Sequence, residues 1–159
     1  MTRVTSLQAT YMTKPVSQKN IVLYADDDPD DLELVQDAFA RYAKNVEVIT
    51  ARDGSQALSW LNRLSEEDPR PCLIILDINM PVLNGKEVLK RLRNMEQFGS
   101  VPVVLFTTSS MPLDDNFARK YSAGFVTKPL DVNQMQVITE LFIDHCSDEI
   151  KKNIRKHIL

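Results

Sequence analysis

The chain has 159 residues, of which 43% are apolar and 26% charged, as is usual for a soluble protein of one domain. Its net charge of −3 gives no global electrostatic argument for nucleic-acid binding. Its apolar runs, about five residues long, are far below the roughly 20 that a membrane helix needs.

Residues 1–19 show no hydrophobic period and lack the apolar centre of a signal peptide. We expect them to form a flexible leader, and we expect the protein to be cytoplasmic, with no membrane partner. The apolar run at 21–25 then predicts a first strand, which ends directly in acidic residues.

These acids fall into two groups. Asp28 is a suitable N-cap for a helix that Pro29 opens, and Asp30 and Asp31 would lie in its first turn, where the helix dipole favours negative charge. We therefore assign a structural role to Asp28, Asp30 and Asp31. The pair at 26–27 instead ends a buried strand, which makes it a candidate functional pair.

The remaining chain alternates strands with helices. Strands are predicted at residues 21–25, 46–50, 72–76, 103–106 and 125–127. Each is followed by a segment with apolar residues at helical spacing. This alternation predicts an α/β fold, a flavodoxin-like doubly wound (βα)5 domain with a five-stranded parallel sheet of order 2-1-3-4-5.

Reactive side chains follow four of the predicted strands. Asp26 and Asp27 follow the first strand, Asp77 follows the third, Thr107 the fourth and Lys128 the fifth. In an open parallel sheet the carboxyl ends of the strands form the ligand-binding edge. Several carboxylates at one edge suit Mg²⁺, which proteins hold with one or two carboxylates together with phosphate oxygens. The pattern indicates a phosphoryl site.

In combination, these motifs resemble the receiver domain of two-component response regulators over residues 20–146. The resemblance rests on Asp26-Asp27, Asp77 with Asn79-Met80-Pro81, Asn84-Gly85, Thr107, and Lys128-Pro129. It is strongest to stand-alone, single-domain regulators such as those paired with bacterial phytochromes.

The resemblance implies a role for each site residue. Asp77 would be the phosphoacceptor, while Asp26, Asp27, Asp77 and the backbone carbonyl of Asn79 would hold Mg²⁺. Thr107 would hydrogen-bond the phosphoryl group and Lys128 would pair with it. The donor would be a sensor histidine kinase or a phosphotransfer protein. The resemblance also implies a cis peptide between Lys128 and Pro129.

Thr107 and Phe125 are the switch residues that the resemblance implies, acting on the face of the fourth helix, fifth strand and fifth helix. Phe125, which lacks the hydroxyl of the more usual Tyr, is equally compatible with a role in core packing alone. This face, or the tail at 147–159, would contact a downstream protein or form a homodimer. The tail carries isoleucines at four-residue spacing beside basic residues, so we expect it to prolong the last helix. Both a contact surface and a frayed helix end are compatible with that pattern.

Two other functions share features with this sequence. A haloacid-dehalogenase-type phosphatase needs a second acid two residues after the nucleophile, where this chain has Asn79, so we expect a signalling protein and not an enzyme. A receiver fold that serves as a docking adaptor without phosphorylation remains the alternative. No output domain, DNA-binding or otherwise, is expected within the 159 residues.

Overall fold

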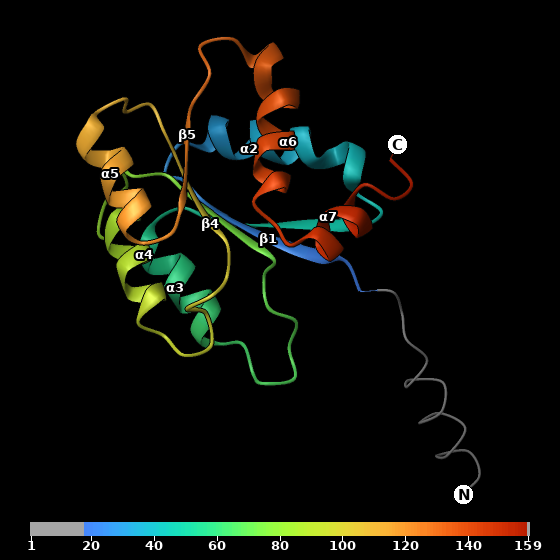
Figure 1. Cartoon of the computed structure of the whole chain (residues 1–159), viewed down its shortest axis with the longest axis horizontal. Helices are drawn as coiled ribbons and strands as arrows, with labels where there is room; N and C mark the ends of the chain where they lie inside the picture. The colour runs from blue at the N-terminus through green and yellow to red at the C-terminus, as the bar shows by residue number, and fades with distance from the viewer. Residues whose placement is uncertain (1–17, 159) are drawn as a thin grey trace, which may run out of the picture.

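The computed structural model describes residues 18–158 as five strands that alternate with helices (Figure 1). The strands are β1 (Asn20–Ala25), β2 (Val46–Ala51), β3 (Leu73–Leu76), β4 (Val103–Thr107) and β5 (Gly124–Thr127). The α-helices are α2 (Pro29–Phe39), α3 (Gly54–Asn62), α4 (Gly85–Arg93), α5 (Pro112–Lys120), α6 (Met135–Asp144) and α7 (Asp148–Ile154). Short 3-10 turns occur at Ala40–Tyr42 and Val132–Gln134.

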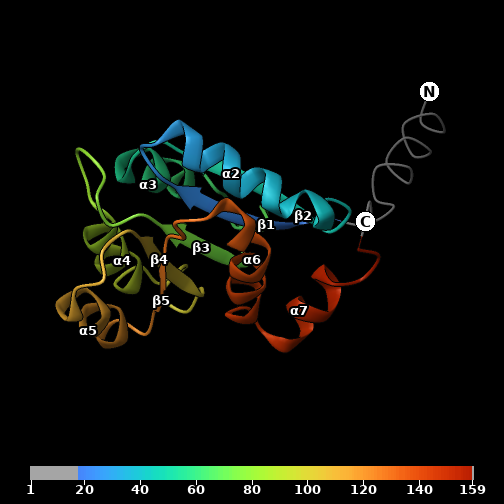
Figure 2. The same ribbon diagram turned by 90° about the horizontal axis from the view of Figure 1, so that it is seen from above.

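All strand pairs are parallel, and the sheet order is β2-β1-β3-β4-β5, which confirms the predicted fold class. The central strand β3 is buried at each of its four residues. That explains its unbroken apolar run, because both of its faces are covered by helices. Figures 1 and 2 show α2, α6 and α7 on one side of the sheet and α3, α4 and α5 on the other.

The two faces of the sheet have separate cores, because alternate residues of a strand point to opposite sides. Tyr24 and Phe106 belong to the core under α2 and α6, whereas Leu23 and Leu105 belong to the core under α3 and α4. Phe142 of α6 meets Phe106 edge-on, with ring centroids 5.0 Å apart. Such a pair adds about 0.5–1.5 kcal/mol beyond the burial of its area.

The tail does not prolong the last helix, contrary to our expectation. Helix α6 ends at Asp144, with His145 as its C-cap, and the side chain of Ser147 accepts a hydrogen bond from the Ile150 N–H, so it caps a separate helix, α7. Ile154 is fully buried against the core under α6. Ile154 and the partly buried Ile150 therefore serve packing within this domain, whereas Ile158 is exposed. Ser147 is the local signal that starts the new helix.

Side-chain hydrogen bonds hold α7 in place. Arg155, the residue after α7, donates to Glu140 and Asp144 of α6, at 2.8 Å each. Asn153 accepts from the side chain of Asn20 at the start of β1 at 2.7 Å. These contacts connect the end of the chain to the beginning of the sheet.

Three other expectations concern the backbone and the chain ends. The Lys128–Pro129 peptide is trans, since residues 18–158 contain no cis peptide bond. The two isomers of an X–Pro bond differ by only about 0.5–1 kcal/mol, so the residue types alone do not decide between them. The expected leader lies outside the described residues except for its last two. Across the described part of the chain, every helix is too short or too polar to span a membrane.

Candidate functional site

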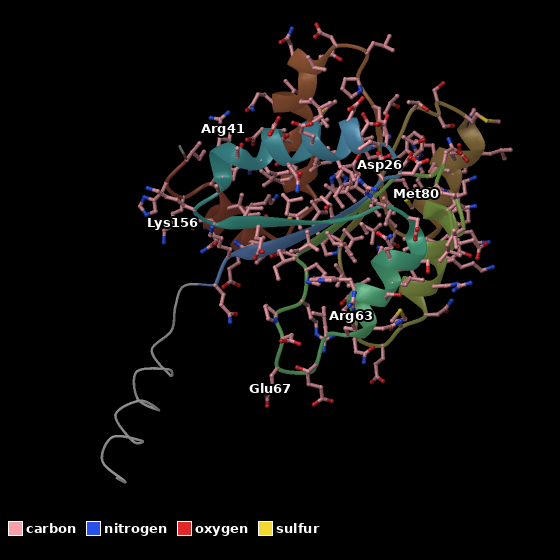
Figure 3. The ribbon with its side chains drawn as sticks, turned by 180° about the vertical axis from the view of Figure 1, so that it is seen from behind. Asp26, Arg41, Arg63, Glu67, Met80 and Lys156 are labelled. Atoms are coloured by element: carbon pink, nitrogen blue, oxygen red, sulfur yellow. The ribbon has the colours of Figure 1, made fainter. Side chains whose placement is uncertain are left out.

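The sheet brings the predicted acids and the lysine to one edge and one face. Asp26 extends β1 through its N–H to the carbonyl of Ala51, and Asp77 extends β3 through its N–H to Ala25, both at 3.0 Å. Asp26 lies two residues beyond Tyr24 of β1, so it points to the same side of the sheet. Figure 3 shows Asp26 at the junction of β1 and α2, with Met80 near the same end of the sheet.

Asp26, Asp27 and Asp77 form an acidic cluster. Each offers a carboxylate oxygen within 4.8 Å of the others. Asp26 is fully buried, Asp77 is 5% exposed and Asp27 is exposed to solvent. Mg²⁺ lies about 2.1 Å from each oxygen ligand, so two oxygens bound to one ion are up to about 4.2 Å apart. A small closure of these side chains would fit a hard divalent cation.

Lys128 neutralises part of this negative charge. Its ammonium nitrogen lies 2.6 Å from Asp26 Oδ2, 2.8 Å from Asp31 Oδ2 and 3.7 Å from Asp77 Oδ1. Burial by itself would lower the pKa of Lys128. The hydrogen bonds to Asp26 and Asp31 outweigh that effect, so the lysine pKa is raised and the ammonium form is secured.

The surroundings of Asp77 oppose its ionisation. Burial, followed by the negative charge of Asp26, raises the pKa of Asp77 to about 6, although Lys128 and the N–H of Asn79 act in the opposite direction. A cation bound beside Asp77 would favour its ionised form. The site therefore links the ionised form of this carboxylate to the presence of positive charge.

The two oxygens of Asp26 have different partners. Oδ2 accepts from the Tyr24 hydroxyl at 2.5 Å and from Lys128, whereas Oδ1 accepts only a backbone N–H, that of Asp28, at 3.0 Å. Burial and the nearby Asp26 carboxylate raise the pKa of Tyr24, so its hydroxyl stays protonated and donates. Oδ1 is consequently the oxygen that remains open to a metal ion.

The loop after Asp77 folds back closely against the strand end. Gly85 at the start of α4 donates to the carbonyl of Ile78, and a Cβ at Gly85 would collide with the backbone carbonyl of Asp77. Only glycine fits this approach. Asn79, two residues after the acid, is exposed in the same loop. The metal-binding role of its carbonyl stays a prediction.

Thr107 and Phe125 lie toward the opposite face, on the side of the core under α3 and α4. Thr107 is fully buried, and its hydroxyl accepts from the Ser109 N–H at 3.2 Å. Ser109 in turn donates to Asp114 of α5 at 2.5 Å, and Asp114 is paired with Lys86 of α4. Phe125 is half-buried. Of the three elements that these residues are expected to influence, α5 is the one that Thr107 reaches, through Ser109 and Asp114. Their role as a switch stays a prediction.

Sequence reasoning missed two residues of the site. Asp31 was assigned to the helix start alone, but its carboxylate also reaches Lys128. Tyr24 was read as one more apolar residue of the first strand, but its hydroxyl bonds Asp26. A phenol two positions before a buried acid on the same strand was a usable signal, because the two side chains share a face.

Comparison with known proteins identifies the family. The response regulator receiver domain matches residues 22–140, so the chain belongs to that family. It is a receiver-domain response regulator with an acidic pocket of Asp26, Asp27 and Asp77 and with Lys128 beside it.

Individual relatives agree with the predicted resemblance to phytochrome-associated regulators. Response regulator Rcp1 of Synechocystis sp. is 34% identical over 100 residues, or 62% of this chain and 68% of Rcp1. The solved Mn²⁺-bound form of response regulator Rcp1 has a TM-score of 0.66 at 30% identity, covering 76% of this chain and 92% of that chain. The phosphorylated cyanobacterial phytochrome response regulator RcpA has a TM-score of 0.73 at 28% identity, covering 82% and 98% respectively.

Proposed function

We propose that the protein is a single-domain response regulator that accepts a phosphoryl group on Asp77. The observation that carries this proposal is the burial of Asp77 at the end of β3, between two further acids and an ion-paired lysine. A buried carboxylate whose ionisation is opposed needs a cationic partner, and a phosphoryl site with a divalent ion supplies one. The donor is a sensor histidine kinase or a phosphotransfer protein, as the family implies.

In the proposed reaction an oxygen of ionised Asp77 attacks the phosphorus of a phosphohistidine. The P–N bond of the donor breaks, and the leaving imidazole takes up a proton from solvent. Asp26, Asp27 and Asp77, with the carbonyl of Asn79, would hold Mg²⁺, which neutralises charge between the acid and the phosphoryl oxygens. The relative Rcp1, solved in an Mn²⁺-bound form, supports the binding of a divalent ion.

Lys128 and Thr107 would complete the site. Lys128 is already ionised and lies 3.7 Å from Asp77, so a phosphoryl oxygen on Asp77 would come within its reach. The Thr107 hydroxyl would move from its bond with the Ser109 N–H to the phosphoryl group. The loss of that bond would disturb the hydrogen bond from Ser109 to Asp114, and the change would thereby be transmitted to α5.

The proposed output is a protein contact. The face of α5, β5 and α6 exposes Leu113, Val137 and Leu141, which suits a downstream protein or a second copy of this chain. The basic residues beside α7 offer a second contact surface. The alternative function, docking without phosphorylation, would use the same surfaces but would not depend on Asp77.

The test is the intact mass of the protein after incubation with acetyl phosphate, with and without Mg²⁺. We expect the wild type to gain one phosphoryl group only with Mg²⁺, and Asp77→Asn to gain none. Asp37→Asn, which changes an exposed acid on α2, is the matched control and should react like the wild type. A folded wild type that gains nothing would favour the docking alternative.

A further inference from the structure

Lys128 is held by an acid that the proposed reaction does not use. Asp31 reaches it from the first turn of α2, with 28% of its side chain exposed, while the lysine side chain is 10% exposed. The two residues come from opposite ends of the domain sequence and meet at 2.8 Å. The Lys128 ammonium also lies 5.7 Å from the ring centre of Phe106.

The arrangement around the ammonium leaves one direction open. A lysine ammonium has three N–H donors. Asp26 at 2.6 Å and Asp31 at 2.8 Å take two of them. The third acceptor, Asp77, is 3.7 Å away, beyond hydrogen-bond distance. This leaves a donor for an oxygen placed on Asp77.

Asp31 is not needed for the helix start. Asp28 already caps α2 by accepting from the Asp30 N–H at 2.9 Å, and Asp30 supplies a second acid in the first turn. Asp30 is exposed to solvent, whereas Asp31 is half-buried and is bonded to Lys128. The neighbouring acids therefore provide a natural comparison, since both complement the helix dipole and only Asp31 contacts the site.

Lysine has a flexible four-carbon stem, so one anchor does not fix its head group. Without Asp31, the close anchor would be Asp26, which the proposed function also assigns to the metal ion. An ion bound at Oδ1 of Asp26 would then draw negative charge away from Oδ2, the oxygen that holds the lysine. A second anchor outside the metal site avoids this conflict.

We propose that Asp31 is a positioning residue that holds the Lys128 ammonium toward the phosphoryl position on Asp77, independently of the metal. This inference rests on the proposed function. It predicts that loss of Asp31 lowers the affinity of the site for a phosphoryl group. The affinity for the metal ion alone should change only by the general effect of removing one negative charge.

The test is calorimetric titration of the full chain, first with Mg²⁺ alone and then with fluoroberyllate, a phosphoryl mimic, at saturating Mg²⁺. The variants are Asp31→Ala, Asp31→Asn and Asp31→Glu, with Asp30→Ala as the matched control. We expect Asp31→Ala to bind fluoroberyllate about 10-fold more weakly than Asp30→Ala, the size typical of one lost charge-assisted hydrogen bond. The affinities of these two variants for Mg²⁺ should be equal.

The other variants separate positioning from folding. Asp31→Asn keeps the shape of the side chain and should lie between wild type and Asp31→Ala, while Asp31→Glu keeps the carboxylate and should recover most of the affinity. Equal fluoroberyllate affinity in Asp31→Ala and Asp30→Ala, with a wild type that binds it, would overturn the inference alone. A wild type that binds no fluoroberyllate would overturn the proposed function, and this inference with it.

Discussion

Asp77→Asn should make the protein more stable when divalent ions are absent. The substitution keeps the size and shape of the side chain and removes its charge. The pKa of Asp77 in the folded protein is about 6, against an ordinary value of 3.8. At about 1.36 kcal/mol per pH unit, this difference corresponds to about 3 kcal/mol.

The sign follows from proton binding. The folded protein holds the Asp77 proton more tightly than the unfolded chain does, so this contribution to stability is complete below pH 3.8 and is lost as pH rises through about 6. Asparagine does not titrate, so Asp77→Asn lacks this pH-dependent contribution to stability. The stability advantage of Asp77→Asn should therefore be near zero at about pH 3 and approach about 3 kcal/mol above about pH 7.

The assay is urea unfolding of wild type and Asp77→Asn in a chelator, followed by circular dichroism at several pH values, with Asp37→Asn as control. Added Mg²⁺ should stabilise the wild type more than Asp77→Asn, because a ligand stabilises the state that binds it. A variant less stable than wild type at neutral pH without metal would refute the reasoning. A stability difference that does not change with pH would refute it as well.

Three further substitutions test other parts of the structure. Tyr24→Phe removes the hydroxyl that orients Asp26, so calorimetry should show Mg²⁺ affinity reduced by about 10-fold; an unchanged affinity would contradict this role. Ile154→Ala should cost about 2–4 kcal/mol in urea unfolding, whereas Ile158→Ala, at a 42% exposed position, should cost under about 0.5 kcal/mol; equal costs would mean that α7 is not docked. Gly85→Ala should slow phosphorylation by acetyl phosphate, because its Cβ displaces the Asp77 backbone; a rate equal to wild type would contradict this.

The features predicted from sequence are those that depend on strand order and strand ends. Asp26, Asp77 and Lys128 each follow a buried strand, and a parallel sheet brings such positions to one edge. That these three residues converge could be predicted without knowing their side-chain conformations. The sheet order could be predicted for the same reason, since alternating strands and helices allow few topologies.

The features that sequence reasoning missed depend on small free-energy differences between alternative conformations, or on contacts with residues that are distant in the sequence. The direction of the Asp31 side chain is set by Lys128, 97 residues away. Whether the tail continued α6 or turned back was decided by the cap at Ser147 and by the burial of Ile154, and four-residue spacing suits either result. Periodicity gives the apolar face of a helix but not the surface that covers it.

The most direct test of the account is to locate the phosphoryl group. Wild-type protein treated with acetyl phosphate and Mg²⁺ is reduced with borohydride, which converts an aspartyl phosphate to homoserine, and the peptides are then sequenced by mass spectrometry. We expect homoserine at position 77 in the wild type, and none when Mg²⁺ is omitted or when Asp77→Asn is treated in the same way. Homoserine at Asp26 or Asp27, or at no position in a folded wild type, would contradict it.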